Sequence, residues 1–202
     1  MKKIKKALIS VSDKKDLKNL LKVLTKYNIE LISSGGTYKE IKKLKFKCLE
    51  VSEYTGSPEI LGGRVKTLHP KIHSGILSKR NNKSHIKDLK NNNFDEIDLV
   101  IVNFYPFEKT LEQTNNHSKI IENIDVGGPT MVRAAAKNYN DVTVITSSNQ
   151  YNDLINEIEN NKGSTSINFR ERMSSEAFSE TAYYDAVISN YFNKIKNNEL
   201  EI

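Results

Sequence analysis

The sequence predicts an α/β fold, in which a parallel sheet carries helices on both faces. Short apolar segments and amphipathic segments alternate from Ala7 to Val51, the order expected when each strand is followed by a helix. The most continuous apolar segment, Ile97–Phe104, lacks polar alternation and is typical of a strand buried on both faces. A chain of 202 residues with 37% hydrophobic content is long enough for one domain with a substantial core.

The first half of the chain is expected to begin with a strand at Ala7–Val11 and a helix that closes near Tyr27-Asn28. That helix is indicated by leucines at helical spacing: Leu17, Leu20, Leu21 and Leu24. The elements that follow are a strand at Ile29–Ser33, a turn at Ser34–Thr37, a helix at about Tyr38–Leu44 and a strand at Phe46–Val51. Ser52–Ser78 is rich in glycine and proline and predicts a long functional loop, and His85–Lys90 predicts a polar surface helix.

The second half continues the alternation. After Ile97–Phe104, which Tyr105-Pro106 stops, we expect a helix at Lys119–Ile124, a break at Gly127-Gly128-Pro129, a helix at Thr130–Tyr139, a strand at Val142–Thr146 and a helix at Tyr151–Glu159. A long helical stretch, Arg170–Lys196, is expected to bury a stripe made of Phe178, Ala182, Ala186 and Ile188. The sequence thus predicts a single domain over residues 1–202, with a helical C-terminal extension over about 165–202.

The composition argues against several classes of protein. The 31 Lys+Arg and 25 Asp+Glu give a net charge of +6, but the lysines are scattered beside acidic residues and many asparagines. Nucleic-acid footprints instead cluster arginines and aromatics on one face. No apolar run could cross a membrane, and the basic N-terminal segment lacks a signal-peptide core. A lone cysteine, Cys48, fits a reducing compartment, so we expect a cytoplasmic protein that binds neither nucleic acid nor membrane.

Ligands of open parallel sheets bind at the carboxyl ends of the strands, where this sequence places unusual polar segments. These are Ser12-Asp13-Lys14, Ser34-Gly35-Gly36-Thr37, Asn103-Phe104-Tyr105-Pro106 and Asp125-Val126-Gly127-Gly128. Ser34–Thr37 offers hydroxyls and glycines that let backbone N–H groups approach a phosphate, and the simpler alternative is an ordinary turn with a helix cap. It matches neither the Walker pattern nor the dinucleotide fingerprint.

The segment Gly62–Pro70 is the densest cluster of candidate side chains. In an extended backbone Arg64 and Lys66 would point to the same side and, with Thr67, would suit a phosphate or a developing oxyanion. The alternative is a solvated loop with two cations. His69 and His73 are spaced like metal ligands, but no third ligand is evident and no metal site is predicted.

Arg133 and Lys137 lie one helical turn apart in the predicted helix Thr130–Tyr139. A lysine beside apolar surface and a second cation could serve as an acid or base, whereas a lysine at a helix C-terminus could also simply complement the helix dipole. Asp125 is consistent with a cap or a catalytic carboxylate, and Tyr105 with a buried phenol or a proton donor. The residues alone leave these alternatives open.

Five runs together resemble one known family. They are Ser10–Lys14, Ser34–Thr37, Gly63–Pro70, Asn103–Phe107 and Asp125–Asn138. In this order they are similar to the inosine monophosphate (IMP) cyclohydrolase half of the bifunctional purine-biosynthesis enzyme, whose other half is aminoimidazole carboxamide ribonucleotide (AICAR) formyltransferase. The resemblance covers about residues 5–195. It implies a methylglyoxal-synthase-like parallel sheet and an enzyme of the cyclic-amidine hydrolase class, which closes formyl-AICAR to IMP with loss of water.

The resemblance also implies roles for individual residues. Lys66, Tyr105, Asp125 and Lys137 match catalytic positions of the family. The matching nucleotide-binding positions are Ser12, Asp13, Lys14, Ser34, Gly35, Gly36, Thr37, Arg64, Val65, Thr67, Asn103, Val126 and Gly127. Asn103 is expected at the base, and Lys66 is the candidate that stabilises the oxyanion. The implied reaction requires no cofactor and no metal.

The chain ends where the family continues into the formyltransferase half, so a separate AICAR formyltransferase is expected to act upstream. A homodimer is compatible with the resemblance. The alternatives are a non-catalytic nucleotide-binding regulatory module of the same fold and a methylglyoxal synthase acting on a triose phosphate. An assay for turnover separates the first alternative from the enzyme, and the choice of substrate separates the second.

Overall fold

The structure is a computed structural model that describes residues 1–197, so residues 198–202 of the predicted extension lie outside it. A five-stranded parallel sheet has the order β4-β3-β2-β5-β6. Its strands are β2 (Lys6–Val11), β3 (Glu30–Ser33), β4 (Leu49–Glu50), β5 (Leu99–Asn103) and β6 (Thr143–Ile145). A separate antiparallel pair joins β1 (Lys2–Lys3) to β7 (Ser164–Thr165).

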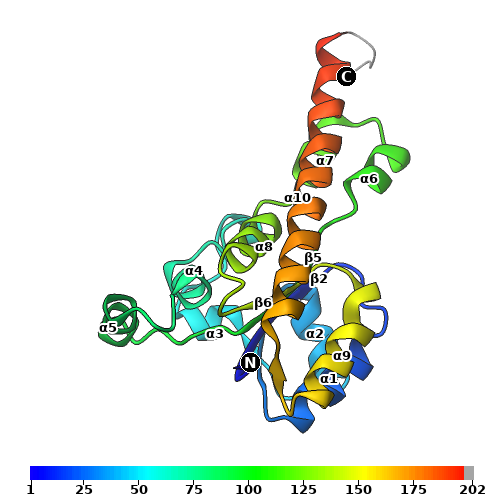
Figure 1. Ribbon diagram of the computed structural model, residues 1–202. Coiled ribbons are helices and arrows are strands. Elements are labelled where there is room, and N and C mark those ends of the chain that lie inside the picture. The colour runs from blue at the N-terminus through cyan, green and yellow to red at the C-terminus, as the bar shows by residue number, and fades with distance from the viewer. Residues whose placement is uncertain (198–202) are drawn as a thin grey trace.

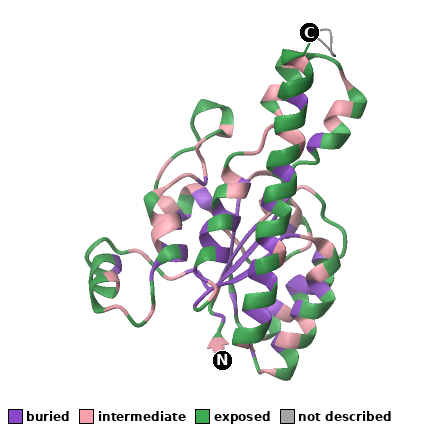
Figure 2. Cartoon of the chain, turned by 45° about the horizontal axis from the view of Figure 1, so that its top comes forward, coloured by how far each residue is buried: buried purple, intermediate pink, exposed green. Residues whose placement is uncertain are grey.

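Helices surround the sheet, with α1 and α9 on one side and α4 and α8 on the other (Figure 1). In chain order they are α1 (Leu17–Lys26), α2 (Gly35–Lys43), α3 (Val51–Thr55), η1 (Leu61–Gly63), α4 (Pro70–Leu77), α5 (Lys83–Asn91), α6 (Phe107–Gln113), α7 (His117–Glu122), α8 (Gly127–Lys137), η2 (Ser148–Gln150), α9 (Tyr151–Asn160) and α10 (Ile167–Lys196). The buried residues concentrate on the sheet and the helix faces against it (Figure 2). No helix of residues 1–197 combines the length and apolarity that crossing a membrane requires.

The α/β fold with a parallel sheet is confirmed, and the departures from the predicted elements are local. The third strand is only Leu49–Glu50, because Val51 already begins α3. The predicted loop Ser52–Ser78 contains α4, which starts at Pro70 with the side chain of His69 as its N-cap. The helix expected from Thr130 begins instead at Gly127, where the missing side chains leave room for neighbours. The short helix α6 was not predicted.

The buried stripe predicted for the C-terminal helix is wrong. Phe178 is 39% exposed, Ala182 and Ala186 are exposed, and Ile188 is only partly buried. The inner face of α10 instead carries Phe169, Arg170, Met173, Ser174, Ala177, Thr181, Tyr184 and Tyr191. Polar groups hold this face: the Ser174 hydroxyl donates to the Ala136 carbonyl at 2.8 Å. A pattern of apolar residues alone therefore selects the wrong side of the helix. Beyond the sheet, the upper half of α10 is flanked by α6 and α7 (Figure 1).

Arg170 fixes the start of α10 and provides a test of the fold. Its side chain is 2% exposed, and its guanidinium donates to the carbonyls of Tyr139 (2.7 Å), Asn140 (3.1 Å) and Thr165 (2.6 Å). Arg170→Met leaves these buried acceptors without a donor, so we expect the free energy of unfolding to fall by about 2–4 kcal/mol in urea denaturation. The control is Arg172→Met, whose exposed pair with Asp153 is worth about 0–1 kcal/mol. Equal losses would contradict the assigned role of Arg170.

Candidate functional site

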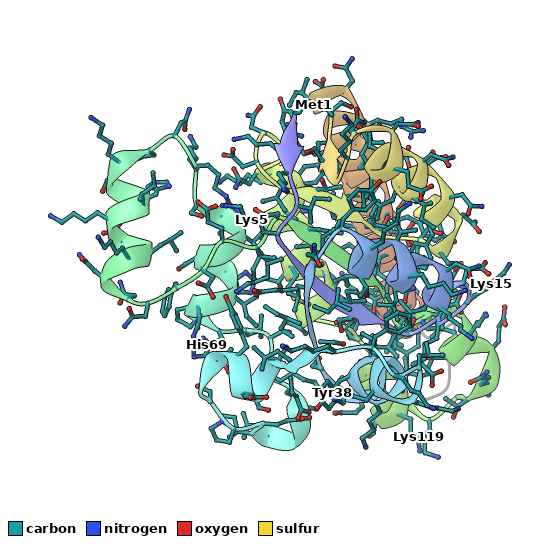
Figure 3. The ribbon with its side chains drawn as sticks, turned by 90° about the horizontal axis from the view of Figure 1, so that it is seen from below. Met1, Lys5, Lys15, Tyr38, His69 and Lys119 are labelled. Carbon is teal, nitrogen blue, oxygen red and sulfur yellow. The ribbon has the colours of Figure 1, made fainter. Side chains whose placement is uncertain are left out.

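A cavity of about 760 Å³ opens at the carboxyl ends of β2, β3 and β5, where α2 and α8 begin. Most of the residues predicted from the sequence line it: Ser12, Lys14, Ser34, Gly35, Gly36, Thr37, Arg64, Lys66, Thr67, Asn103, Tyr105, Asp125, Val126 and Gly127. Asp13, Val65 and Lys137 are not among its lining residues. In the view of Figure 3, Tyr38 on α2 and Lys119 on α7 lie on the same side of the molecule, opposite Met1. The volume is within the range of small-molecule sites.

Asn103, at the end of β5, holds the loop that follows β2. Its Oδ1 accepts from the N–H groups of Ser12 (2.6 Å) and Asp13 (3.1 Å), and its Nδ2 donates to the Asp13 carbonyl at 3.2 Å. The Ser12 hydroxyl lies 2.8 Å from both Asn103 Oδ1 and the Phe104 carbonyl. The amide of Asn103 is therefore engaged in shaping the Ser12–Lys14 loop, and its contact with a base stays a prediction.

The N-terminus of α2 forms the floor beside this loop. The Ser34 side chain does not cap the helix. Gly35 adopts a φ of 54°, which favours glycine. The Thr37 hydroxyl is used internally, since it accepts from Val11 N–H at 3.0 Å and donates to the Val11 carbonyl at 2.9 Å. The ammonium of Lys14 donates to the Ser12 carbonyl at 3.2 Å and has no carboxylate partner within residues 1–197. Backbone N–H groups and Lys14 thus leave a positive region at this end.

Arg64 and Lys66 both line the cavity, but the extended backbone expected to align them is absent. The segment is a turn rather than an extended strand: Arg64 has φ −62° and ψ −23°, and Leu68 N–H donates to the Val65 carbonyl at 3.0 Å. The Arg64 guanidinium pairs with Glu122 on α7. The Lys66 ammonium instead pairs with Glu59 at 2.9 Å. Each cation of this loop therefore enters the site with a carboxylate neighbour.

Asp125 lies at the start of α8, and its Oδ1 accepts from the Gly128 N–H at 2.8 Å. A Cβ built on Gly128 would be 2.4 Å from Asp125 Oδ2, so only glycine allows this approach. The loss of surrounding water raises the pKa of Asp125, outweighing the N–H groups of Gly128 and Tyr105 that lower it. A carboxyl whose pKa is raised in this way keeps its proton to higher pH than a solvated one, which suits a group that moves a proton.

Two further contacts build the same end of the cavity. The Thr67 hydroxyl lies against Gly127, where a built Cβ would be 2.6 Å from Thr67 Oγ1. From α10, the Tyr184 hydroxyl accepts the N–H of Asp125 at 2.8 Å. The rings of Tyr184 and Phe104 are 5.0 Å apart between centroids. The C-terminal helix therefore supports the Asp125 turn directly.

The two histidines have different surroundings. His69 Nδ1 accepts the N–H of Lys71 at 3.1 Å, and its Nε2 lies 3.1 Å from the Ser57 hydroxyl. Burial lowers the pKa of His73, against a hydrogen bond with the Thr67 backbone that raises it. Within residues 1–197, no cluster of three or more His, Cys, Asp or Glu side chains could hold a metal ion.

Lys137 lies at the opposite end of α8 from the cavity. The helix has 11 residues, so its ends are roughly 15 Å apart. Lys137 is exposed there, and Arg133 is exposed over the Phe178 ring, 5.7 Å from its centroid. The residues of this chain that line the cavity do not include either cation.

Sequence reasoning missed Glu59, Glu122 and Tyr184. Single acidic residues in a loop or on a surface helix carry no recognisable spacing, and Tyr184 is distant from the other site residues in the chain. Their roles come from contacts with Lys66, Arg64 and Asp125, respectively. These contacts depend on the folded arrangement of α7, α10 and the loop before η1.

Two family models match this chain, and curated proteins are similar to it. The family described as the MGS-like domain matches residues 16–130, and the family described as the AICARFT/IMPCHase bienzyme matches residues 135–202. The bifunctional purine biosynthesis protein PurH of Bradyrhizobium diazoefficiens is 47% identical over 192 residues, covering 95% of this chain and 36% of the relative. The protein of the same name from Rippkaea orientalis is 50% identical over 188 residues, covering 92% of this chain and 36% of the relative.

One solved structure, the crystal structure of ForH, has a TM-score of 0.82 and 28% identity, and the match covers 94% of this chain and 99% of that one. By contrast, the chain spans about a third of the length of the curated relatives it matches.

Proposed function

The chain belongs to the MGS-like domain family, and from this we propose that it is an enzyme of purine biosynthesis that closes formyl-AICAR to IMP. One observation carries the proposal. A single cavity combines two helix N-termini and the ammonium of Lys14 with a partly buried carboxyl, Asp125, and a second lysine, Lys66. Such a cavity suits a substrate that has a phosphate at one end and a ring to be closed at the other.

The phosphate is expected at the N-terminus of α2. Gly36 approaches Lys14, since a Cβ built there would be 3.9 Å from the lysine Nζ. Free backbone N–H groups of a helix N-terminus and one unpaired ammonium favour a dianion. The paired cations Arg64 and Lys66 are then available to other parts of the ligand.

The ring closure joins the carboxamide nitrogen to the formyl carbon, and water leaves with the former carbonyl oxygen and two protons. Holding the two groups against each other can contribute roughly 7–11 kcal/mol to such a reaction. We assign Lys66 to the developing oxyanion. Asp125, with its raised pKa, is suited to move a proton between nitrogen and oxygen, and Tyr105 lines the cavity beside it.

Other parts of the proposal come from the resemblance alone. A catalytic role for Lys137 stays a prediction that no contact with the cavity of this chain supports. The same holds for a homodimer, a separate AICAR formyltransferase, a cytoplasmic location and the assignment of residues 1–202 to one cyclohydrolase domain.

The phosphate assignment predicts that Lys14→Ala weakens binding of IMP by roughly 10- to 100-fold in isothermal titration calorimetry, the effect of losing one charge-assisted hydrogen bond. Lys15→Ala is the matched control, since Lys15 is the exposed neighbour and its backbone N–H, not its ammonium, bonds Asp13. Equal affinities of the Lys14 variant and the wild type would move the phosphate elsewhere.

The activity itself is tested by ultraviolet absorbance, which follows the purine ring as it forms from formyl-AICAR. Purified protein should form IMP well above the uncatalysed rate. Binding of IMP without turnover would support a regulatory module instead, and turnover of a triose phosphate would support a methylglyoxal synthase.

A further inference from the structure

Glu59, in the loop before η1, pairs with the cavity lysine Lys66 and has no role in the proposed reaction. Its Oε1 lies 2.9 Å from the Nζ of Lys66. The side chains are 46% and 29% exposed, so Lys66 is the better enclosed partner. Exposed or half-exposed pairs of this kind contribute little to stability. The main effect of the pair is therefore expected on the position of the Lys66 side chain and not on the stability of the fold.

Two glycines make room for the pair. A Cβ built on Gly63 would lie 2.3 Å from Glu59 Oε1 and 3.2 Å from Lys66 Nζ. A Cβ built on Gly35, across the cavity floor, would lie 3.3 Å from the same Nζ. Gly63 has φ 93° and Gly35 has φ 54°, which any other residue would adopt with strain. The ammonium of Lys66 thus lies between Gly35 and Gly63, and the Glu59 carboxylate contacts it beside Gly63.

Two other cations line the cavity, Lys14 and Arg64, and their partners differ from that of Lys66. Lys14 has no carboxylate partner within residues 1–197 and faces the same helix N-terminus. The Arg64 guanidinium, two residues before Lys66, is held by Glu122 on another element. A carboxylate beside Lys66 also repels a phosphate, which directs the phosphate to Lys14. Lys14 and Lys66 thus both reach the N-terminus of α2, and of the two only Lys66 is held there by a carboxylate within residues 1–197.

We propose that Glu59 is a positioning residue for Lys66. Its carboxylate holds the flexible lysine side chain between Gly35 and Gly63, so that the ammonium is already in place when the reacting part of the substrate arrives. Glu59 itself does not touch the substrate. This inference rests on the proposed function for its kinetic consequence, and on the ion pair alone for its structural one.

The ion pair is tested without any assay of activity. The protein is treated with a limiting amount of an acetylating reagent, and modification of each lysine is measured by peptide mass spectrometry. Glu59→Gln should increase acetylation of Lys66 severalfold and leave that of Lys14 unchanged, because a paired ammonium must lose its partner before it reacts. The control Glu53→Gln alters an exposed acid on α3 and should change neither. Unchanged modification of Lys66 in Glu59→Gln would overturn the proposal.

The kinetic test separates positioning from a general effect on the fold. Glu59→Ala should lower kcat by roughly 10- to 100-fold, the effect of a slightly misplaced catalytic group, with little change in KM or thermal stability. The double variant Glu59→Ala with Lys66→Ala should be no slower than Lys66→Ala alone, because Glu59 acts only through that lysine. A further loss in the double variant, or full activity of Glu59→Ala, would refute the proposal. If the wild type shows no turnover, the proposed function fails, and the acetylation result still decides whether Glu59 holds Lys66.

Discussion

Asp125→Asn should remove most of the turnover while leaving the folded protein at least as stable at neutral pH. The amide keeps an oxygen that accepts the Gly128 N–H, so the turn that starts α8 is retained. It cannot exchange a proton with the substrate, and the loss of a positioned acid or base typically costs about 10²–10⁴ in kcat. The ultraviolet assay of ring closure measures this loss, and Asp88→Asn on the exposed face of α5 is the control.

The stability of Asp125→Asn relative to wild type should change with pH in one direction. Because the pKa of Asp125 is raised in the folded chain, the folded state binds the proton more tightly than the unfolded state. This stabilises the wild type at acid pH, and the contribution is lost as the pH rises through the folded pKa. Asparagine never ionises, so the stability of Asp125→Asn relative to wild type should increase in urea denaturation as the pH rises from the acid range through the folded pKa of Asp125.

Two results would contradict this assignment. Retention of full turnover would show that another group moves the proton. A variant that loses stability relative to wild type as the pH rises would show that the helix N-terminus outweighs desolvation, so that the ionised carboxylate is the favoured form.

Lys66→Ala should lower kcat by about 10²–10³, the usual cost of removing one donor to a developing oxyanion. Because that charge forms only in the transition state, KM for the substrate should change far less than kcat. The fold should persist, since the only ion pair lost from the described residues is the half-exposed one with Glu59.

The measurement combines steady-state kinetics with calorimetric binding of IMP. Lys39→Ala, an exposed lysine one turn into α2, removes the same charge close to the cavity and should leave both quantities unchanged. A large loss of IMP affinity with unchanged kcat would instead assign Lys66 to ground-state binding, and Lys14 would then share the phosphate with it.

Much of the fold follows from local pattern. The leucines of α1 recur at helical spacing and are all buried, and the apolar run around β5 lies within the sheet between β2 and β6. These predictions succeed because the spacing of apolar residues alone indicates which residues of a helix or strand are buried. The stripe on α10 fails because its inner face is held by hydrogen bonds of Arg170 and Ser174, which an apolar period does not record.

The candidate site, like the fold, could be predicted from the sequence only in part. Glycine-rich turns after strands indicated the cavity, because the carboxyl ends of parallel strands meet at one edge. The separate carboxylate partners of Arg64 and Lys66 depend on a turn whose geometry follows from Gly62, Gly63 and their neighbours. No spacing in the sequence indicates which carboxylate each cation meets.

The sequence by itself therefore determined the α/β fold, the segments that form the cavity and the family to which the chain is similar. Only the tertiary structure decided that Asp125 loses water, that Glu59 holds Lys66, that Tyr184 reaches the Asp125 backbone and that Lys137 lies away from the cavity. The physical reason is the separation along the chain over which each kind of interaction acts. Hydrophobic period and turn chemistry act between neighbours in the chain, whereas desolvation and ion pairing depend on which distant segments the fold brings within a few ångströms.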